Sequence, residues 1–173
     1  EKGKSLTVGV DYKKQKLNEI NKYFEFKLAT VFRDTEENFI PNSSSLNKKN
    51  SNLFGSIENK FSENFSLDYD FRIDNNYDRI EYNSINAGFK LNKFETNFNY
   101  VEENGDAGDT NFLENNTTYQ INDSSYFTFS TRRNRKLNLT EFYDLVYEYK
   151  NDCLVASIKY KKKYYSDRDL KPS

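Results

Sequence analysis

The sequence predicts an all-β fold, an antiparallel up-and-down meander of about ten strands of about ten residues each. Apolar and polar residues alternate with a period of two along most of the chain, which is the pattern of a strand and not of a helix. The 173 residues include 14 Tyr and 15 Phe, too much ring area for a disordered chain. The breaks between the alternating runs are tight and loose in turn, as in a meander.

The strands of the first half follow from this alternation. Residues 6–12 alternate strictly, and residues 20–32 form one long run whose second face carries Glu25 and Lys27. Residues 51–60 alternate more weakly. Residues 64–74 give the clearest pattern, with rings and aliphatic side chains at the odd positions. The even positions between them hold Ser66, Asp68, Asp70 and Arg72.

The second half continues in the same way. Residues 79–91 form a strand whose alternation changes parity after Tyr82, which indicates a β-bulge. Residues 94–100 alternate strictly between rings or Thr and polar side chains. The remaining predicted strands are 112–121, 125–133, 139–150 and 154–161. Tight breaks fall at 60–63, 91–93, 122–124 and 151–152, and loose ones at 33–50, 74–78, 102–110 and 133–137.

The composition excludes several kinds of chemistry. The chain has no His and one Cys, so it cannot assemble a His-based catalytic or metal site or a Cys-based zinc cluster. Its six Gly are scattered and form no phosphate-binding loop. The net charge of −1 gives no basic surplus for nucleic acid. We therefore expect no enzymatic activity, no cofactor, no metal and no nucleic-acid partner.

Two all-β architectures fit the alternation. One is a soluble β-sandwich of the glycan-binding kind, with its apolar faces turned inward. The other is a transmembrane β-barrel, with the apolar face toward lipid and the polar face toward a hydrated lumen. Short breaks alternating with long ones, and apolar faces rich in Phe and Tyr, favour the barrel. The mean hydropathy of −0.99 agrees with either architecture, because charged faces and polar loops dilute the rings.

Two stretches resemble the LptD (OstA/Imp) family of outer-membrane lipopolysaccharide-assembly proteins, in its C-terminal barrel region. The first is EFYDLVYEYKNDCL at 141–154, followed by SIKYK at 157–161 and RDLKPS at 168–173. The second is ATVFRD at 29–34, followed by IP at 40–41 and SLNKKNS at 45–51. Many members of the family carry two adjacent cysteines where this chain has Cys153 alone.

This resemblance implies a segment of a barrel of about two dozen strands in the cell outer membrane, which inserts lipopolysaccharide into the outer leaflet. The expected partners are lipopolysaccharide, outer-membrane lipid, a lipoprotein plug (LptE-like) and a periplasmic lipopolysaccharide bridge (LptA-like). Residues 1–173 would then be part of the C-terminal β-barrel domain, without the N-terminal periplasmic domain and the remaining strands. A diffusion porin or another outer-membrane barrel remains an alternative.

The resemblance also makes Cys153 the candidate for a disulfide to the periplasmic domain. A periplasmic Cys153 fixes the direction of every strand: the breaks near 13–20, 61, 92, 123 and 151 become periplasmic. The breaks at 33–50, 74–78, 102–111 and 133–138 become extracellular, so most of the longer connections lie outside, as in known barrels.

Two sets of side chains are candidates for contact with the transported molecule. The first set would line the lumen and comprises Asp68, Asp70, Arg72, Glu95, Asn97, Asn99, Lys159 and Lys161. The second set would meet lipopolysaccharide phosphates at the outer rim and comprises Arg132, Arg133, Arg135, Lys136, Lys162 and Lys163. Plain solvation of a wide lumen and of a loop rim is the alternative for both sets.

Overall fold

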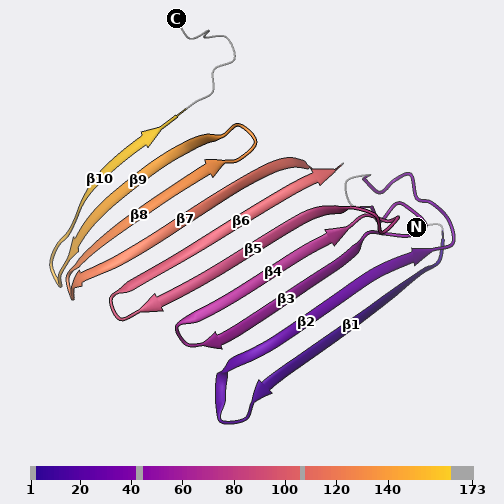
Figure 1. Cartoon of the computed structure of the whole chain (residues 1–173), viewed down its shortest axis with the longest axis horizontal. Helices are drawn as coiled ribbons and strands as arrows, with labels where there is room; N and C mark the ends of the chain where they lie inside the picture. The colour runs from indigo at the N-terminus through magenta and orange to yellow at the C-terminus, as the bar shows by residue number, and fades with distance from the viewer. Residues whose placement is uncertain (1–2, 42–44, 106–107, 165–173) are drawn as a thin grey trace, which may run out of the picture.

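The chain folds into one antiparallel sheet of ten strands in sequence order, from β1 at one edge to β10 at the other (Figure 1). This computed structural model describes residues 3–41, 45–105 and 108–164. The strands are β1 Ser5–Lys16, β2 Glu19–Arg33, β3 Leu53–Ser62, β4 Phe65–Ile73, β5 Ile80–Leu91, β6 Phe94–Gly105, β7 Gly108–Asn122, β8 Ser125–Asn134, β9 Leu139–Lys150 and β10 Val155–Lys163. The predicted all-β meander of ten up-and-down strands is confirmed. Residues 168–173, which carry part of the family resemblance, lie outside the described residues.

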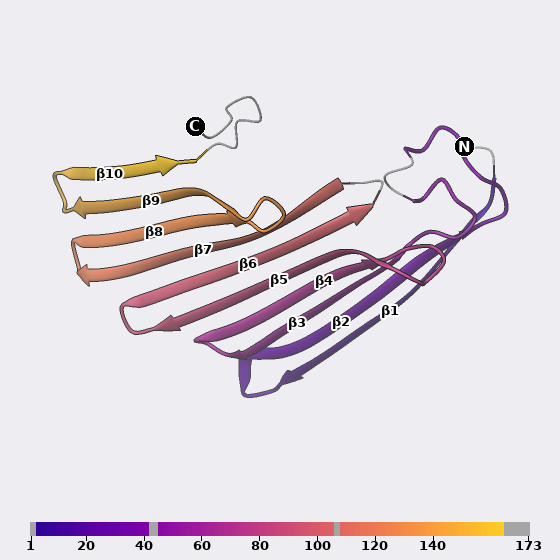
Figure 2. The ribbon, with the colours of Figure 1, turned by 45° about the horizontal axis from the view of Figure 1, so that its top comes forward.

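The sheet is open and twisted. Each strand pairs with its neighbours in sequence, and no pairing joins β1 to β10 within the described residues. The strands change direction progressively from β1 to β10 (Figure 2), which is the ordinary twist of a sheet. One long edge of β1 and one of β10 therefore have no strand beside them in the described part of the chain.

Two predicted breaks are wrong, because polar residues continue the strands there. Residues 102–105 and 108–110 form the paired ends of β6 and β7, which reach Gly105 opposite Gly108. Strand β1 likewise continues to Lys16 instead of ending at Tyr12. In both places cross-strand backbone hydrogen bonds extend the sheet past the last apolar residues, where alternation gives no signal.

The predicted bulge exists in β5, immediately before Tyr82 instead of after it. Arg72 pairs with Tyr82 and Ile73 pairs with Ile80, so Glu81 is the extra residue on β5. Both Glu81 and Tyr82 approach Arg72, whereas Ile80 stays with the apolar side chains. The parity change in the sequence is thus the mark of the bulge.

Register gives the sheet two different faces. On one face, which we call the ring face, cross-strand rows hold mainly Phe, Tyr, Leu, Ile and Val. A typical row runs from Tyr12 through Phe26, Ile57 and Tyr69 to Ile85. The other face, which we call the polar face, holds the acidic, basic and amide side chains between them. The surface hollows lie mainly on the polar face, which is therefore the concave one.

No hydrophobic residue is fully buried in the described part of the chain. Rings of the ring face remain open, for example Phe98 with 46% and Tyr119 with 47% of their surface exposed. The structure thus places a wide apolar face where a soluble domain would place a second layer. The described residues contain no helix with the length and apolarity needed to cross a membrane.

The two ends of the strands differ. At one end, which we call the short-turn rim, adjacent strands are joined at 17–18, 63–64, 92–93, 123–124 and 151–154. Asn92 adopts a φ of 51° there, a conformation that Asn tolerates better than most residues. The opposite end, which we call the loop rim, carries the connection of 34–52 and those of 74–79 and 135–138. The predicted asymmetry of the connections is confirmed except at the β6–β7 hairpin.

Candidate functional site

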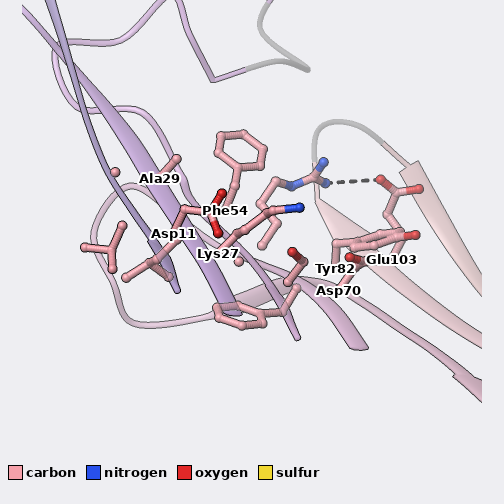
Figure 3. Close-up of a pocket in the computed structure, with 14 residues that line it drawn as sticks. Asp11, Lys27, Ala29, Phe54, Asp70, Tyr82 and Glu103 are labelled. Atoms are coloured by element: carbon pink, nitrogen blue, oxygen red, sulfur yellow. Dashed lines mark hydrogen bonds and ion pairs between the residues drawn. The ribbon is translucent and has the colours of Figure 1, made fainter. Parts of the chain in front are cut away.

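A hollow of about 650 Å³ lies on the polar face over strands β1 to β6. Two cross-strand rows build its floor. The first row runs Gly9, Ala29, Phe54, Arg72, Tyr82 and Glu103, one residue from each strand. The second row runs Asp11, Lys27, Ser56 and Asp70. Figure 3 labels seven of these residues, on neighbouring strands around the same space: Asp11, Lys27, Ala29, Phe54, Asp70, Tyr82 and Glu103.

Arg72 organises one wall of the hollow. Its Nη2 donates to Glu103 on β6 at 3.1 Å, and its Nε lies 3.5 Å from Glu81 on β5. Its guanidinium also packs against the ring of Tyr82, with 5.8 Å to the ring centroid. Asn52, at the end of the β2–β3 loop, donates to Glu81 at 2.7 Å. The cluster therefore joins three strands and anchors a long loop, and Arg79, 3.2 Å from Glu81, supplies the second cation that balances the two carboxylates.

All eight predicted lumen residues share the polar face, although they come from β4, β6 and β10. Asp68, Asp70 and Arg72 alternate along β4. Asn97 and Asn99 line a second hollow, of about 470 Å³, together with Lys161. Glu95 pairs with Lys90 at 3.5 Å.

The last two lumen candidates form a second charge cluster at the β9–β10 edge. Lys159 and Lys161 lie 3.0 and 3.5 Å from the same carboxylate oxygen of Asp144. Asp144 is thus the acidic partner that holds two adjacent cations of β10 on the polar face.

The predicted outer-rim cations do not lie together. Arg132 is on the polar face, 2.9 Å from Glu141, and its guanidinium lies 3.9 Å from the ring centroid of Phe112. Arg133 is on the opposite face and donates to Asn138. Adjacent positions on a strand point to opposite faces, which separates these two arginines.

The other four cations also lie at the loop rim. Arg135 stacks over Tyr100 at 5.4 Å, and Lys136 forms an ion pair with Asp109, so the β8–β9 loop is fastened to the β6–β7 hairpin. Lys162 lies 4.8 Å from the ring centroid of Tyr164, and Lys163 is exposed on the polar side of β10. Within the described residues, five of the six candidates, all except Lys163, contact acceptors or rings of the chain itself.

Cys153 lies at the short-turn rim, in the connection between β9 and β10. Its thiol is free and exposed. Asn151 shapes this connection by accepting hydrogen bonds from the backbone of Cys153 at 3.0 Å and of Leu154 at 2.8 Å. The thiol is therefore available to a partner that approaches this rim.

Two acidic side chains at the loop rim have lowered pKa values. Burial of the Asp74 carboxyl raises its pKa, but hydrogen bonds from the backbone of Asp78 at 2.9 Å and Arg79 at 3.1 Å lower it by more. The pKa of Asp34 is lowered chiefly by the backbone N–H of Lys4, which donates at 2.9 Å. Both carboxylates hold the backbone at strand ends.

The ring face contains a closed polar network. Thr96 and Thr117 lie opposite each other with their hydroxyls 2.7 Å apart. Asn115 donates to Thr96 at 2.9 Å and to the carbonyl of Asn97 at 3.2 Å, and accepts from Thr117 at 3.0 Å. On the same face Tyr69 donates to Asn83 at 2.7 Å. These polar groups satisfy one another without solvent, as a low-dielectric surrounding requires.

Several residues of the polar face are not predicted by the sequence pattern. Glu81, Glu103 and Asp144 are the partners of predicted cations, and Phe54 is a ring on the polar side. The parity change at Tyr82 is a signal that could have found Glu81. The others depend on register between strands, which alternation within one strand does not give.

The comparisons with known proteins do not identify the chain. No protein-family model matches it, and no curated protein does. Among the described residues no group of three or more His, Cys, Asp or Glu side chains could hold a metal ion.

Proposed function

We propose that the chain is a segment of a large outer-membrane β-barrel that carries lipopolysaccharide to the outer leaflet. The observation that carries the membrane part of this proposal is the ring face, an open apolar surface on which Thr96, Asn115 and Thr117 hydrogen-bond to one another. The lipopolysaccharide part comes from the resemblance at 29–51 and 141–173.

The ring face supports a lipid environment by its energetics. Each fully exposed Phe or Leu on such a face would forgo about 1.5–3 kcal/mol of burial in water. In a bilayer the same side chains contact lipid tails at no such cost, and a free-energy penalty falls on polar groups that lack a hydrogen bond. Thr96, Asn115 and Thr117 meet that requirement through their network.

The concave polar face supports a hydrated lumen. Several of its acidic and basic side chains pair with one another, in clusters around Arg72 and Asp144. A barrel interior of this kind stays wet and excludes acyl chains, whereas it admits a sugar moiety. In the proposed mechanism the saccharide passes along this face while the acyl chains leave through an opened seam between strands into lipid.

The open edges of β1 and β10 support a larger barrel. Unpaired strand edges are costly in a membrane, so in this proposal further strands pair with them. A self-contained ten-stranded porin would join β1 to β10 instead. A soluble sandwich would need a second sheet, and all ten strands lie in one.

The proposal assigns the short-turn rim to the periplasm and the loop rim to the outside. Cys153 would there bond to a periplasmic domain, and the lipoprotein plug and the lipopolysaccharide bridge would approach from the same side. Non-reducing electrophoresis of the whole protein tests the bond. The mobility difference between reduced and unreduced protein should vanish in Cys153→Ser; normal cross-linking in that variant would contradict the assignment.

Depletion of the protein in the cell that encodes it tests the transport function. Newly made lipopolysaccharide should fail to reach an impermeant surface label and should accumulate on the inner side of the envelope. An unchanged lipopolysaccharide distribution, together with slower uptake of small hydrophilic solutes, would instead indicate a diffusion porin.

A further inference from the structure

Phe54 is an uncovered ring on the polar face. Several other rings of this face lie under a cation: Tyr23 under Lys13 at 4.7 Å, Tyr82 under Arg72 at 5.8 Å, Phe112 under Arg132 at 3.9 Å and Phe142 under Lys161 at 5.8 Å. Phe54 has no ring or cation contact with another described residue, and 37% of its surface is exposed. An exposed ring inside a charged concavity needs another explanation than packing.

The neighbours of Phe54 leave its side toward β1 open. In its cross-strand row the next two residues are Ala29 and Gly9, which project almost no side chain. These small residues help to form the hollow of about 650 Å³, a size typical of small-ligand sites. Figure 3 shows the Phe54 ring standing beside Ala29 at the edge of this space.

The neighbouring cross-strand row, which runs from Asp11 to Asp70, supplies polar side chains that are free to form hydrogen bonds with a ligand. Asp11, Ser56 and Asp70 form no hydrogen bond or ion pair with another described side chain, in contrast to Glu81, Glu103 and Asp144. Asp11 and Asp70 are separated by β2 and β3, about 14 Å along the sheet. That span is too wide for one metal ion to bridge, and it suits a ligand with several hydroxyls.

We propose that this hollow binds the pyranose rings of a saccharide, with Phe54 as the stacking platform and Asp11 and Asp70 as acceptors for hydroxyl groups. The C–H face of a pyranose carries partial positive charge and meets the negative face of the Phe54 ring. Carboxylates accept two hydrogen bonds from adjacent sugar hydroxyls. An acyl chain would instead leave both carboxylates desolvated without a partner. The inference deepens the proposed function and rests on it.

Binding of a delipidated lipopolysaccharide core oligosaccharide to the full chain in detergent micelles tests the site. Calorimetry gives the dissociation constant, and saturation-transfer NMR with irradiation of aromatic protons reports the ring contact. Phe54→Leu keeps an apolar side chain without a ring and should weaken binding about tenfold, by analogy with the loss when an aromatic platform for a nucleic-acid base is removed. Phe54→Tyr keeps the ring and should bind as the unmodified chain does.

Two further variants guard against misfolding and unspecific effects. Ala29→Leu should fill the hollow and abolish binding while the far-ultraviolet spectrum stays that of a sheet. Phe112→Leu removes a polar-face ring that Arg132 already covers, and should leave binding unchanged. Three results would overturn the inference. The first is that Phe54→Leu and Ala29→Leu bind the oligosaccharide as tightly as the unmodified chain does. The second is that the unmodified chain does not bind it, and the third is saturation transfer to lauric acid in place of the oligosaccharide.

The results separate this site from the transport function. If the chain binds the oligosaccharide through Phe54 but lipopolysaccharide export stays normal when the protein is depleted, the proposed function is refuted and the saccharide site stands. If export fails when the protein is depleted but the oligosaccharide does not bind through Phe54, the site is refuted and the proposed function stands.

Discussion

Nη2 of Arg72 lies 3.1 Å from the carboxylate of Glu103 and so links β4 to β6 across the intervening β5. Both side chains are largely buried, with 15% and 21% of their surface exposed. Because Glu81 is the extra residue of the bulge in β5, its carboxylate also reaches the guanidinium of Arg72, at 3.5 Å from Nε. This cluster links β4, β5 and β6 beside the hollow.

Loss of Arg72 should destabilise the fold. Arg72→Gln leaves the largely buried carboxylate of Glu103 without a cation and Glu81 with only the exposed Arg79, which we expect to cost about 2 kcal/mol of unfolding free energy. Arg79→Gln is the matched control, because Arg79 also pairs with Glu81 but is 62% exposed, and it should cost less than about 0.5 kcal/mol. Denaturant unfolding in micelles measures both. Equal costs for the two variants would contradict the role of Arg72.

Gly55 and Phe71 form a cross-strand pair that should tolerate no larger residue. They lie opposite each other on β3 and β4, and a Cβ at Gly55 would overlap the ring of Phe71. Gly55→Ala should therefore cost about 1–2 kcal/mol, because the ring must leave its place. Gly88→Ala meets only the tips of two polar side chains and should cost less. Adding Phe71→Leu should remove most of the Gly55→Ala penalty in a double-mutant cycle; strictly additive effects would contradict the contact.

The β4–β5 turn should open in acid. The folded pKa of Asp74 is lowered, so its hydrogen bonds contribute stability that is full above the unfolded pKa of about 4 and is lost as pH falls through the folded value. Hydrogen exchange at the amides of Asp78 and Arg79 should accelerate below about pH 4 beyond the intrinsic trend. Asp74→Asn removes the titrating group and should abolish that pH dependence. Identical pH profiles for both proteins would refute the assignment.

The two rims should face opposite sides of the outer membrane. In a Cys153→Ser background, cysteine at Leu137 on the loop rim should react with an impermeant maleimide on intact cells. Cysteine at Asp152 on the short-turn rim should react only after the outer membrane is permeabilised. The reverse pattern would invert the proposed orientation, and labelling of both on intact cells would rule out a spanning segment.

The strands and their faces were predictable because alternation with a period of two is a local property. Residues 65–73 show it directly, with rings at odd and charges at even positions. Even the bulge beside Tyr82 left a trace as a change of parity. The polar ends of β6 and β7 were not predictable, because beyond the apolar band strand and loop have the same composition.

The candidate site was only half predictable for a related reason. Within β4, Asp68, Asp70 and Arg72 share a face by spacing alone. The partners of Arg72 and the open side of Phe54 depend on register across several strands, which loops and bulges set. The outer-rim cations show the same limit, since Arg132 and Arg133 are adjacent in sequence and lie on opposite faces.

Fluorescence from two single-tryptophan variants tests the two-faced sheet most directly. The chain has no Trp, and Asn97 and Phe98 are adjacent, exposed and on opposite faces of β6. In vesicles containing acyl-brominated phosphatidylcholine, Phe98→Trp should be quenched strongly by the bromines and Asn97→Trp only by aqueous iodide. Equal quenching of both by iodide, with no effect of brominated acyl chains on Phe98→Trp, would contradict a membrane-facing ring face.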